Sequence, residues 1–185
     1  MNTANSLTAL RIVLILPFLL LIDSGRYGLA LGTFFVASIT DFLDGYIARR
    51  FAQQTRLGRF LDPLADKLLV SSAYIAMAIP RPGLPSIPVW LAAAVVGRDI
   101  MILAGSLIIY LATEFKDFKP SLISKVNTLL ELGLIVYFLS VNATDSLSFL
   151  RTLQPVCYGI VAVAVVASGV DYAIKGAAII RAHRR

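Results

Sequence analysis

Residues 41–66, DFLDGYIARRFAQQTRLGRFLDPLAD, place four aspartates and four arginines between two long apolar segments. Asp41 and Asp44 stand three residues apart at the end of the first segment, and Asp62 and Asp66 stand four apart at the start of the second. Residues three or four apart share one face of a helix, so each pair is expected on a single face. A short connection would fold the two helix ends together and bring four carboxylates to one point.

The composition around this stretch is that of a membrane protein. Of the 185 residues, 58% are hydrophobic and 15% are charged, with a mean hydropathy of +0.80. So few polar side chains cannot cover a soluble globule, and we predict an all-α integral membrane protein in which residues 1–185 form a single domain. Asn5, Thr8 and Arg11 recur at helical spacing at the start of the first apolar run and predict an N-terminal interfacial segment. The six expected transmembrane helices are Leu7–Ile22, Tyr27–Ile47, Leu61–Ile79, Ile87–Ala112, Leu122–Val141 and Leu153–Ala173.

The net charge of +6 lies in short clusters between apolar runs, which favours an anionic membrane surface and not nucleic acid as the partner. Eleven lysines and arginines fall on one side of the predicted spans and three on the other. The positive-inside rule puts the richer side, with both termini and the acidic stretch, in the cytoplasm. We expect the cytoplasmic (inner) membrane of a bacterium. The richer side carries Arg49, Arg50, Arg56, Arg59, Lys116, Lys119, Lys125, Lys175, Arg181, Arg184 and Arg185.

Four converging carboxylates need positive charge among them, because like charges in a poorly solvated site repel and take up protons. The stretch contains no histidine or cysteine, and all-oxygen ligands favour Mg²⁺ or Mn²⁺ over soft metals. Two such ions could clamp a phosphate or pyrophosphate. The alternative is that each acid pairs with a basic neighbour such as Arg49 or Lys67. Four acids at this spacing favour the metal site.

Small residues accompany the acids. Gly45 and Ala48 continue the face of Asp41 and Asp44, and Gly58 lies four residues before Asp62. A glycine within a helix costs about 1 kcal/mol relative to alanine, so its presence indicates the close approach of something bulky, such as a nucleotide base. Close packing between membrane helices is the alternative reading of each small residue.

Together these positions form the pattern D-x2-D-G-x2-A-R-x8-G-x3-D-x3-D. The pattern resembles the signature of the CDP-alcohol phosphotransferase (CDP-alcohol phosphatidyltransferase) family. The resemblance covers most of the chain, and it implies the six-helix membrane fold of that family, a cavity that opens to the cytoplasm and a homodimer. The fixed positions are Asp41, Asp44, Gly45, Ala48, Arg49, Gly58, Asp62 and Asp66.

The resemblance also implies roles for these residues. Asp41, Asp44 and Asp62 would bind two divalent ions that hold the pyrophosphate of CDP-diacylglycerol. Asp66 would bind metal and act as the general base on the acceptor hydroxyl, with CMP as the leaving group. The implied CDP-lipid-binding residues are Asn5, Thr8, Gly45, Ala48, Arg49 and Gly58.

The acceptor is predicted from two cations outside the signature, Arg98 and Lys125, which would attract a phosphate in a low-dielectric pocket. The N-terminal pattern Asn5-x2-Thr8-x2-Arg11 and the two cations are similar to those of phosphatidylglycerophosphate synthases and mitochondrial-type cardiolipin synthases. Two cations that the former tend to carry are replaced here by Ser106 and Asn127, whereas residues 119–128, KPSLISKVNT, are similar to the latter. We therefore expect phosphatidylglycerol slightly ahead of glycerol 3-phosphate.

Other interpretations remain open. Arg98 could pair with Asp99 or Glu131 and serve only helix packing. The acceptor could be another alcohol, such as inositol or serine. From other functional classes, a membrane ion transporter would also use an acidic cluster, although the arginines between the acid pairs suit an anionic substrate better. A non-catalytic lipid-binding protein would tolerate the loss of an acid, and all four are present.

Overall fold

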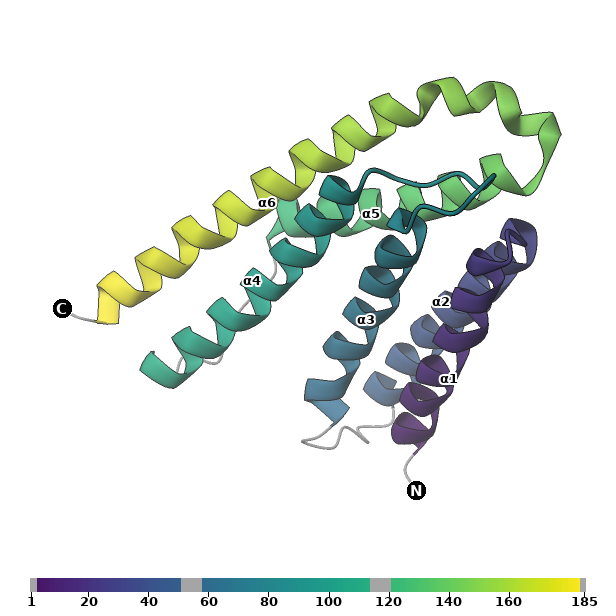
Figure 1. Ribbon diagram of the computed structural model, residues 1–185. Coiled ribbons are helices and arrows are strands. Elements are labelled where there is room, and N and C mark those ends of the chain that lie inside the picture. The colour runs from purple at the N-terminus through teal and green to yellow at the C-terminus, as the bar shows by residue number, and fades with distance from the viewer. Residues whose placement is uncertain (1–2, 51–57, 114–120, 184–185) are drawn as a thin grey trace. The chain divides into compact units, whose positions relative to one another are not determined.

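The computed structural model describes the backbone of residues 3–50, 58–113 and 121–183, and the side chains of residues 13–40, 67–106, 121–179 and 181. In these ranges it contains α-helices, one 3₁₀ helix and no β-strand, which confirms the all-α prediction (Figure 1). The elements are α1 (Thr3–Asp23), α2 (Tyr27–Arg50), α3 (Gly58–Ala78), α4 (Val89–Thr113), α5 (Leu122–Ala143), the 3₁₀ helix η1 (Asp145–Leu153) and α6 (Gln154–His183).

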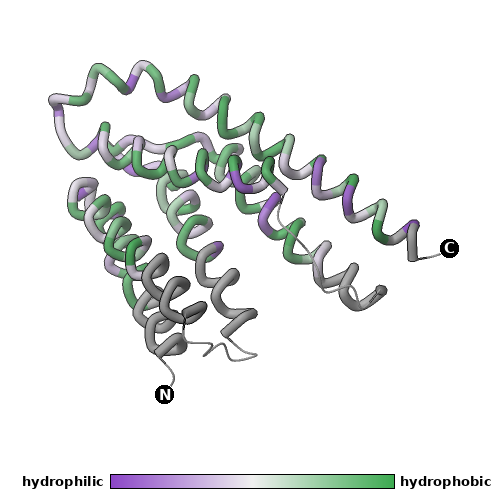
Figure 2. Tube along the Cα trace, turned by 180° about the vertical axis from the view of Figure 1, so that it is seen from behind, coloured by the Kyte–Doolittle hydropathy of each residue, from purple (hydrophilic) through white to green (hydrophobic). Residues whose placement is uncertain are grey.

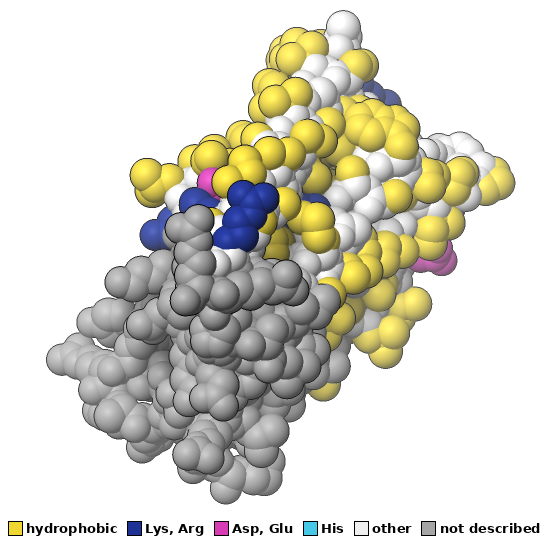
Figure 3. Space-filling view, turned by 90° about the vertical axis from the view of Figure 1, so that its left-hand side faces the viewer, with side chains coloured by type: hydrophobic (Ala, Val, Ile, Leu, Met, Phe, Trp, Pro, Cys, Tyr) yellow, Lys and Arg dark blue, Asp and Glu magenta, His cyan; other side chains and the backbone are white. Residues whose placement is uncertain are grey.

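Each of the six predicted apolar segments corresponds to one α-helix. Three helical stretches of the described chain are long and apolar enough to cross a membrane: Val89–Ser106, Leu122–Ala143 and Asp145–Ile179. Shorter apolar stretches lie in α1, α2 and α3. The helices are hydrophobic over most of their described length (Figure 2), and hydrophobic side chains dominate the described surface seen in Figure 3. The chain is therefore a membrane protein.

Two features differ from the sequence prediction. The predicted interfacial segment is not a separate helix, because α1 continues unbroken from Thr3 through Pro17 to Asp23. The connection before α6 is helical, since η1 occupies residues that were expected to be a loop, and α6 itself continues beyond Ala173 to His183.

The chain divides into two compact units, which are described separately. Unit 1 comprises Met1–Ile87 and Ile135–Arg151, and unit 2 comprises Pro88–Leu134 and Thr152–Arg185. The single domain expected from the sequence stays a prediction.

In unit 1, α1 packs against both α2 and α3. Gly25 ends α1 with a positive φ of 71°, and its N–H donates to Ile22 O while the N–H of Arg26 donates to Leu21 O. These two bonds form a Schellman motif, which satisfies the last carbonyls of the helix and reverses the chain into α2. The ring centroids of Phe18 and Phe34 then lie 5.8 Å apart between the two helices.

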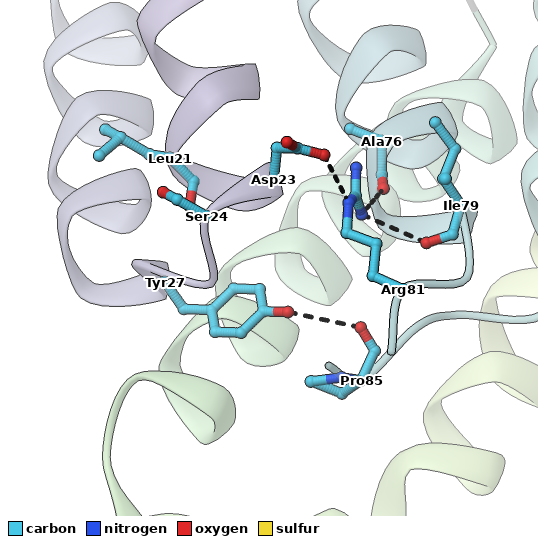
Figure 4. A network of polar contacts seen from close by, with 8 residues as sticks. All are labelled: Leu21, Asp23, Ser24, Tyr27, Ala76, Ile79, Arg81 and Pro85. Atoms are coloured by element: carbon cyan, nitrogen blue, oxygen red, sulfur yellow. Dashed lines mark hydrogen bonds and ion pairs between the residues drawn. The ribbon is translucent and has the colours of Figure 1, made fainter. Parts of the chain in front are cut away.

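The connection after α3 is the proline-rich turn expected from the sequence, and it lies beside the turn between α1 and α2. Arg81 is its centre (Figure 4): Nε donates to Asp23 Oδ1 at 2.7 Å, and Nη1 donates to Ala76 O and Ile79 O at 2.8 and 3.2 Å. The guanidinium therefore satisfies carbonyls at the C-terminal end of α3 and ties that end to the end of α1.

In unit 2, α4 and α6 pack side by side and run in the same direction (Figure 1). Glycines allow the close approach. A Cβ atom on Gly105 would lie 2.9 Å from Tyr172 Cε1, and one on Gly169 would lie 3.4 Å from Met101 Cε. Small residues of this kind are typical of interfaces between membrane helices.

Candidate functional site

The acid pairs occupy the two helix ends that the sequence predicted. Asp41 and Asp44 belong to the last part of α2, and Asp62 and Asp66 to the first part of α3. Because α2 and α3 run in opposite directions, these two ends lie at the same end of unit 1 (Figure 1). Outside the described side chains lie those of all four aspartates and of Asn5, Thr8, Gly45, Ala48, Arg49 and Gly58.

The helical register of α2 gives further information about the first pair. Its buried residues, Tyr27, Ala30, Phe34 and Ala37, follow alternating spacings of three and four residues along the inward face. The same alternation continues to positions 41, 44 and 48. Asp41, Asp44 and Ala48 therefore stand at register positions on the inward face of α2.

The register of α3 gives the same result for the second pair. Leu69, Ala73 and Met77 are buried at spacings of four, and positions 66 and 62 precede Leu69 by three and seven residues. Asp62 and Asp66 thus stand at register positions on the inward face of α3.

This donor set fits a divalent metal site. Four aspartates at these register positions in a membrane protein would require cations, and hard oxygen ligands select Mg²⁺ or Mn²⁺. Among the described side chains no group of three or more His, Cys, Asp and Glu residues could hold a metal, and the four aspartates lie outside that set.

The two predicted acceptor residues both belong to unit 2, and they differ in exposure. Arg98, on α4, is buried with a side chain only 3% exposed. Its Nη1 donates to Asp99 Oδ1 at 2.7 Å, and its Nη2 donates to Ser124 Oγ of α5 at 2.7 Å and Ser168 Oγ of α6 at 2.6 Å. The pairing with Asp99, an alternative from the sequence, is therefore present, while the role of Arg98 toward an acceptor stays a prediction.

One nitrogen of the Arg98 guanidinium remains available for a further group. Its Nε lies buried without a hydrogen-bond partner among the described residues. A buried N–H group usually has a partner, so this atom is available to a ligand or to a water molecule.

Lys125 lies on the exposed side of the first turn of α5. Ser121 caps that turn, because its Oγ accepts from the N–H of Ser124 at 3.1 Å and its carbonyl accepts from the N–H of Lys125 at 3.1 Å. The cap fixes the backbone that carries Lys125, and the side chain of Lys125 is exposed.

Sequence reasoning missed Ser124 and Ser168, the two hydroxyl partners of Arg98. Ser124, Asn127 and Glu131 recur along one face of α5, and Asn127 Nδ2 donates to Glu131 Oε1 at 2.6 Å with both residues fully buried. Ser168 is the buried polar residue of α6. The signal for the α5 residues was their spacing of three and four within an apolar segment, whereas a lone serine in α6 carries no such signal.

Comparison with known proteins gives the family. A model of CDP-alcohol phosphatidyltransferases matches residues 1–171. The chain is 36% identical over 161 residues to a cardiolipin synthase (CMP-forming) of Rattus norvegicus, covering 77% of this chain and 51% of the relative. It is 42% identical over 110 residues to a CDP-diacylglycerol--glycerol-3-phosphate 3-phosphatidyltransferase of Pseudomonas fluorescens, covering 56% and 54%.

A relative of similar length is the CDP-diacylglycerol--glycerol-3-phosphate 3-phosphatidyltransferase of Aquifex aeolicus, 30% identical over 177 residues, which cover 95% of this chain and 96% of the relative. The chain spans about half the length of the rat and Pseudomonas relatives. The match to the family covers the acid stretch, α4 and the first turn of α5. The protein therefore belongs to the CDP-alcohol phosphatidyltransferase family.

Proposed function

We propose that the protein transfers a phosphatidyl group from CDP-diacylglycerol to a hydroxyl of a glycerol-based acceptor and releases CMP. The observation that carries the proposal is the register of the four aspartates, which continues the inward faces of α2 and α3 in a chain of this family. The names of the relatives, which include glycerol-3-phosphate phosphatidyltransferases and cardiolipin synthases, give further support.

The chemistry assigned to the chain is one displacement at phosphorus. The acceptor oxygen forms a bond to the phosphorus of the phosphatidyl group while the bond from that phosphorus to the bridging oxygen breaks, and CMP departs with this oxygen. Asp66 accepts the hydroxyl proton, because an alcohol is a weak nucleophile until it loses that proton. No covalent intermediate with the protein is required.

Asp41, Asp44, Asp62 and Asp66 would hold two divalent ions, Mg²⁺ or Mn²⁺. When bound, such ions neutralise charge on the pyrophosphate oxygens and on the departing CMP. Gly45, Ala48 and Gly58, at the same end of unit 1, would leave room beside the backbone for the CDP-lipid. Arg49 would contact a phosphate or an aspartate. Asn5 and Thr8, near the start of α1, complete this part of the site.

Arg98 and Lys125 would receive the phosphate of the acceptor. Asp99 already neutralises Arg98, so the pair contributes little net charge, and the exposed Lys125 supplies the second cation. This balance suits the single charge of a phosphodiester better than the double charge of a phosphomonoester. We therefore favour phosphatidylglycerol, with cardiolipin as product, over glycerol 3-phosphate, with phosphatidylglycerophosphate as product.

The proposal also includes the membrane and the side of it on which the reaction takes place. The excess of basic residues beside the acid stretch supports an active site that faces the cytoplasm at a bacterial inner membrane. A homodimer is part of the proposal through the family resemblance.

The decisive experiment is an assay of the purified protein in phospholipid vesicles with CDP-diacylglycerol and Mg²⁺. CMP release is followed with phosphatidylglycerol, glycerol 3-phosphate, inositol and serine offered separately, and the lipid products are identified by mass spectrometry. We expect CMP and cardiolipin, or CMP and phosphatidylglycerophosphate, with one of the first two acceptors.

Two outcomes would count against the proposal. Turnover only with inositol or serine would keep the reaction and change the acceptor class. Absence of CMP with all four acceptors, together with ion flux across the vesicle membrane that is lost in Asp44→Asn, would favour the transporter.

A further inference from the structure

Three helices of unit 2 meet at the guanidinium of Arg98. Its Nη2 uses both of its N–H groups, one toward Ser124 Oγ of α5 and one toward Ser168 Oγ of α6. A guanidinium is planar and its donors have fixed directions, so two acceptors on one nitrogen set its rotation as well as its position. Asp99 alone, bonded to Nη1, would leave the group free to turn about that contact.

Ser124 also connects Arg98 to the turn that carries Lys125. Ser124 directly precedes Lys125, and the N–H of Ser124 donates to the cap residue Ser121. The Ser121 hydroxyl also lies near the carboxylate of Asp171 on α6, which accepts a bond from Lys175 at 2.9 Å. The first turn of α5 is therefore attached to both α4 and α6 through Ser124 and Arg98.

The contacts follow the order expected of antiparallel helices. Ser168 and Asp171 are three residues apart on α6, and the residues they approach, Ser124 and Ser121, are three apart in the opposite order on α5. One face of α6 thus holds one turn of α5 at two successive points.

We propose that Ser124 and Ser168 are positioning residues of the acceptor site. They fix Arg98 by direct bonds, and they fix Lys125 through the first turn of α5, so that the two cations keep one separation. The inference rests on the proposed function, in which these cations bind the acceptor phosphate. Neither serine needs to touch the substrate.

The kinetic test uses Ser124→Ala, Ser168→Ala and the double variant in the vesicle assay, with whichever acceptor the wild type uses. Hydrogen bonds to a charged group are worth about 1.5–3 kcal/mol, so the double variant is expected to raise the acceptor KM about tenfold or more. The KM for CDP-diacylglycerol and kcat stay within about twofold of wild type, because the aspartate site is untouched.

Two comparison variants separate positioning from general damage. Ser124→Thr keeps the hydroxyl and is expected to keep the wild-type acceptor KM. Ser72→Ala removes a hydroxyl that bonds to Leu69 O within α3, and it is expected to change neither KM. An equal rise of both KM values in the double variant would contradict the inference.

A second readout does not need turnover. A spin label attached at Lys125→Cys, with the native Cys157 changed to Ser, reports the order of the first turn of α5. We expect greater label mobility with the Ser124→Ala and Ser168→Ala changes and no increase with Ser72→Ala. Unchanged mobility would overturn the inference whether or not the wild type releases CMP, whereas an inactive wild type with increased mobility in the double variant would count against the proposed function alone.

Discussion

The Nη1 atom of Arg98 lies 2.7 Å from Oδ1 of Asp99, and each of the two side chains is only 3% exposed. A buried charge is tolerated when a partner and further hydrogen bonds compensate its lost hydration. Here the two serines supply those bonds, so the ion pair and its hydroxyl partners act as one polar cluster inside apolar helices.

Removal of Asp99 should therefore destabilise unit 2. We expect Asp99→Ala to lower the free energy of unfolding by about 3–5 kcal/mol, because it leaves a buried guanidinium without its counterion. Asp99→Asn should cost less, since an amide oxygen still accepts a hydrogen bond. Loss of helical circular dichroism on denaturation in mild detergent measures both. Asp145→Ala, at an exposed position in η1, is the control, and an equal effect of Asp99→Ala and Asp145→Ala would contradict the expectation.

Substitutions of Arg81 and Asp23 distinguish two contributions to stability: the ion pair between these residues, and the bonds from Arg81 to backbone carbonyls. The Arg81 side chain is 14% exposed and that of Asp23 is 68% exposed, so the ion pair itself is worth less than about 1 kcal/mol. The bond from Arg81 to Ala76 O is partly buried, and with the bond to Ile79 O it satisfies the end of α3, so Arg81→Ala should cost about 1–2 kcal/mol. We expect Arg81→Ala to be clearly more destabilising than Asp23→Ala in the same unfolding measurement. If both substitutions lowered the free energy of unfolding equally, the ion pair would be the important contact, and not the bonds to the carbonyls at the end of α3.

Gly25 and Gly32 form a matched pair of glycine positions. Gly25 has a φ of 71°, and a Cβ there would lie 2.9 Å from Leu84 Cδ2. Gly25→Ala should therefore destabilise the protein by about 1 kcal/mol or more. Gly32, within α2, has no heavy atom within 4 Å of an added Cβ, and Gly32→Ala should be neutral or stabilising by up to about 1 kcal/mol. If both substitutions lowered the free energy of unfolding, or both raised it, the expected difference between the two glycines would be wrong.

The sequence predicted the helices well because hydrophobicity alone produces them, and it predicted their ends less well. The part of α6 after Ala173 was missed because hydropathy falls there, although the buried spacing of Val161, Val165 and Ser168 continues to Gly176. A helix that is buried on one side by small residues remains stable where its average hydropathy is low. The 3₁₀ helix η1 was missed because its nine residues are too few to show a period.

In the candidate site, too, some residues could be predicted from the sequence and others could not. The aspartates were predictable because their spacing is local and one helix turn relates each pair. The two serine partners of Arg98 were not, because Ser124 and Ser168 stand 26 and 70 residues away along the chain. A lone neutral serine such as Ser168 gives no sign of a long-range contact, and only the packing of α6 against α4 brings it to the guanidinium.

Chelation should remove activity reversibly. We expect excess EDTA to abolish CMP release and added Mg²⁺ or Mn²⁺ to restore it, because four carboxylates without cations repel each other and the substrate pyrophosphate. The concentration of Mg²⁺ that gives half-maximal activity should rise in Asp44→Asn, which removes one charged ligand, and stay unchanged in Asp145→Asn. Full activity in EDTA would contradict the metal site.

Asp66→Asn tests the general base. The amide cannot accept a proton, and loss of general base catalysis is expected to lower kcat by about 10²-fold to 10⁴-fold while the helical content stays that of the wild type. Asp66 is also a proposed metal ligand, so the assay is repeated over a range of Mg²⁺ concentrations. A defect that persists at saturating Mg²⁺ assigns the loss to proton transfer, whereas recovery at high Mg²⁺ would reduce Asp66 to a metal ligand and exclude it as the base.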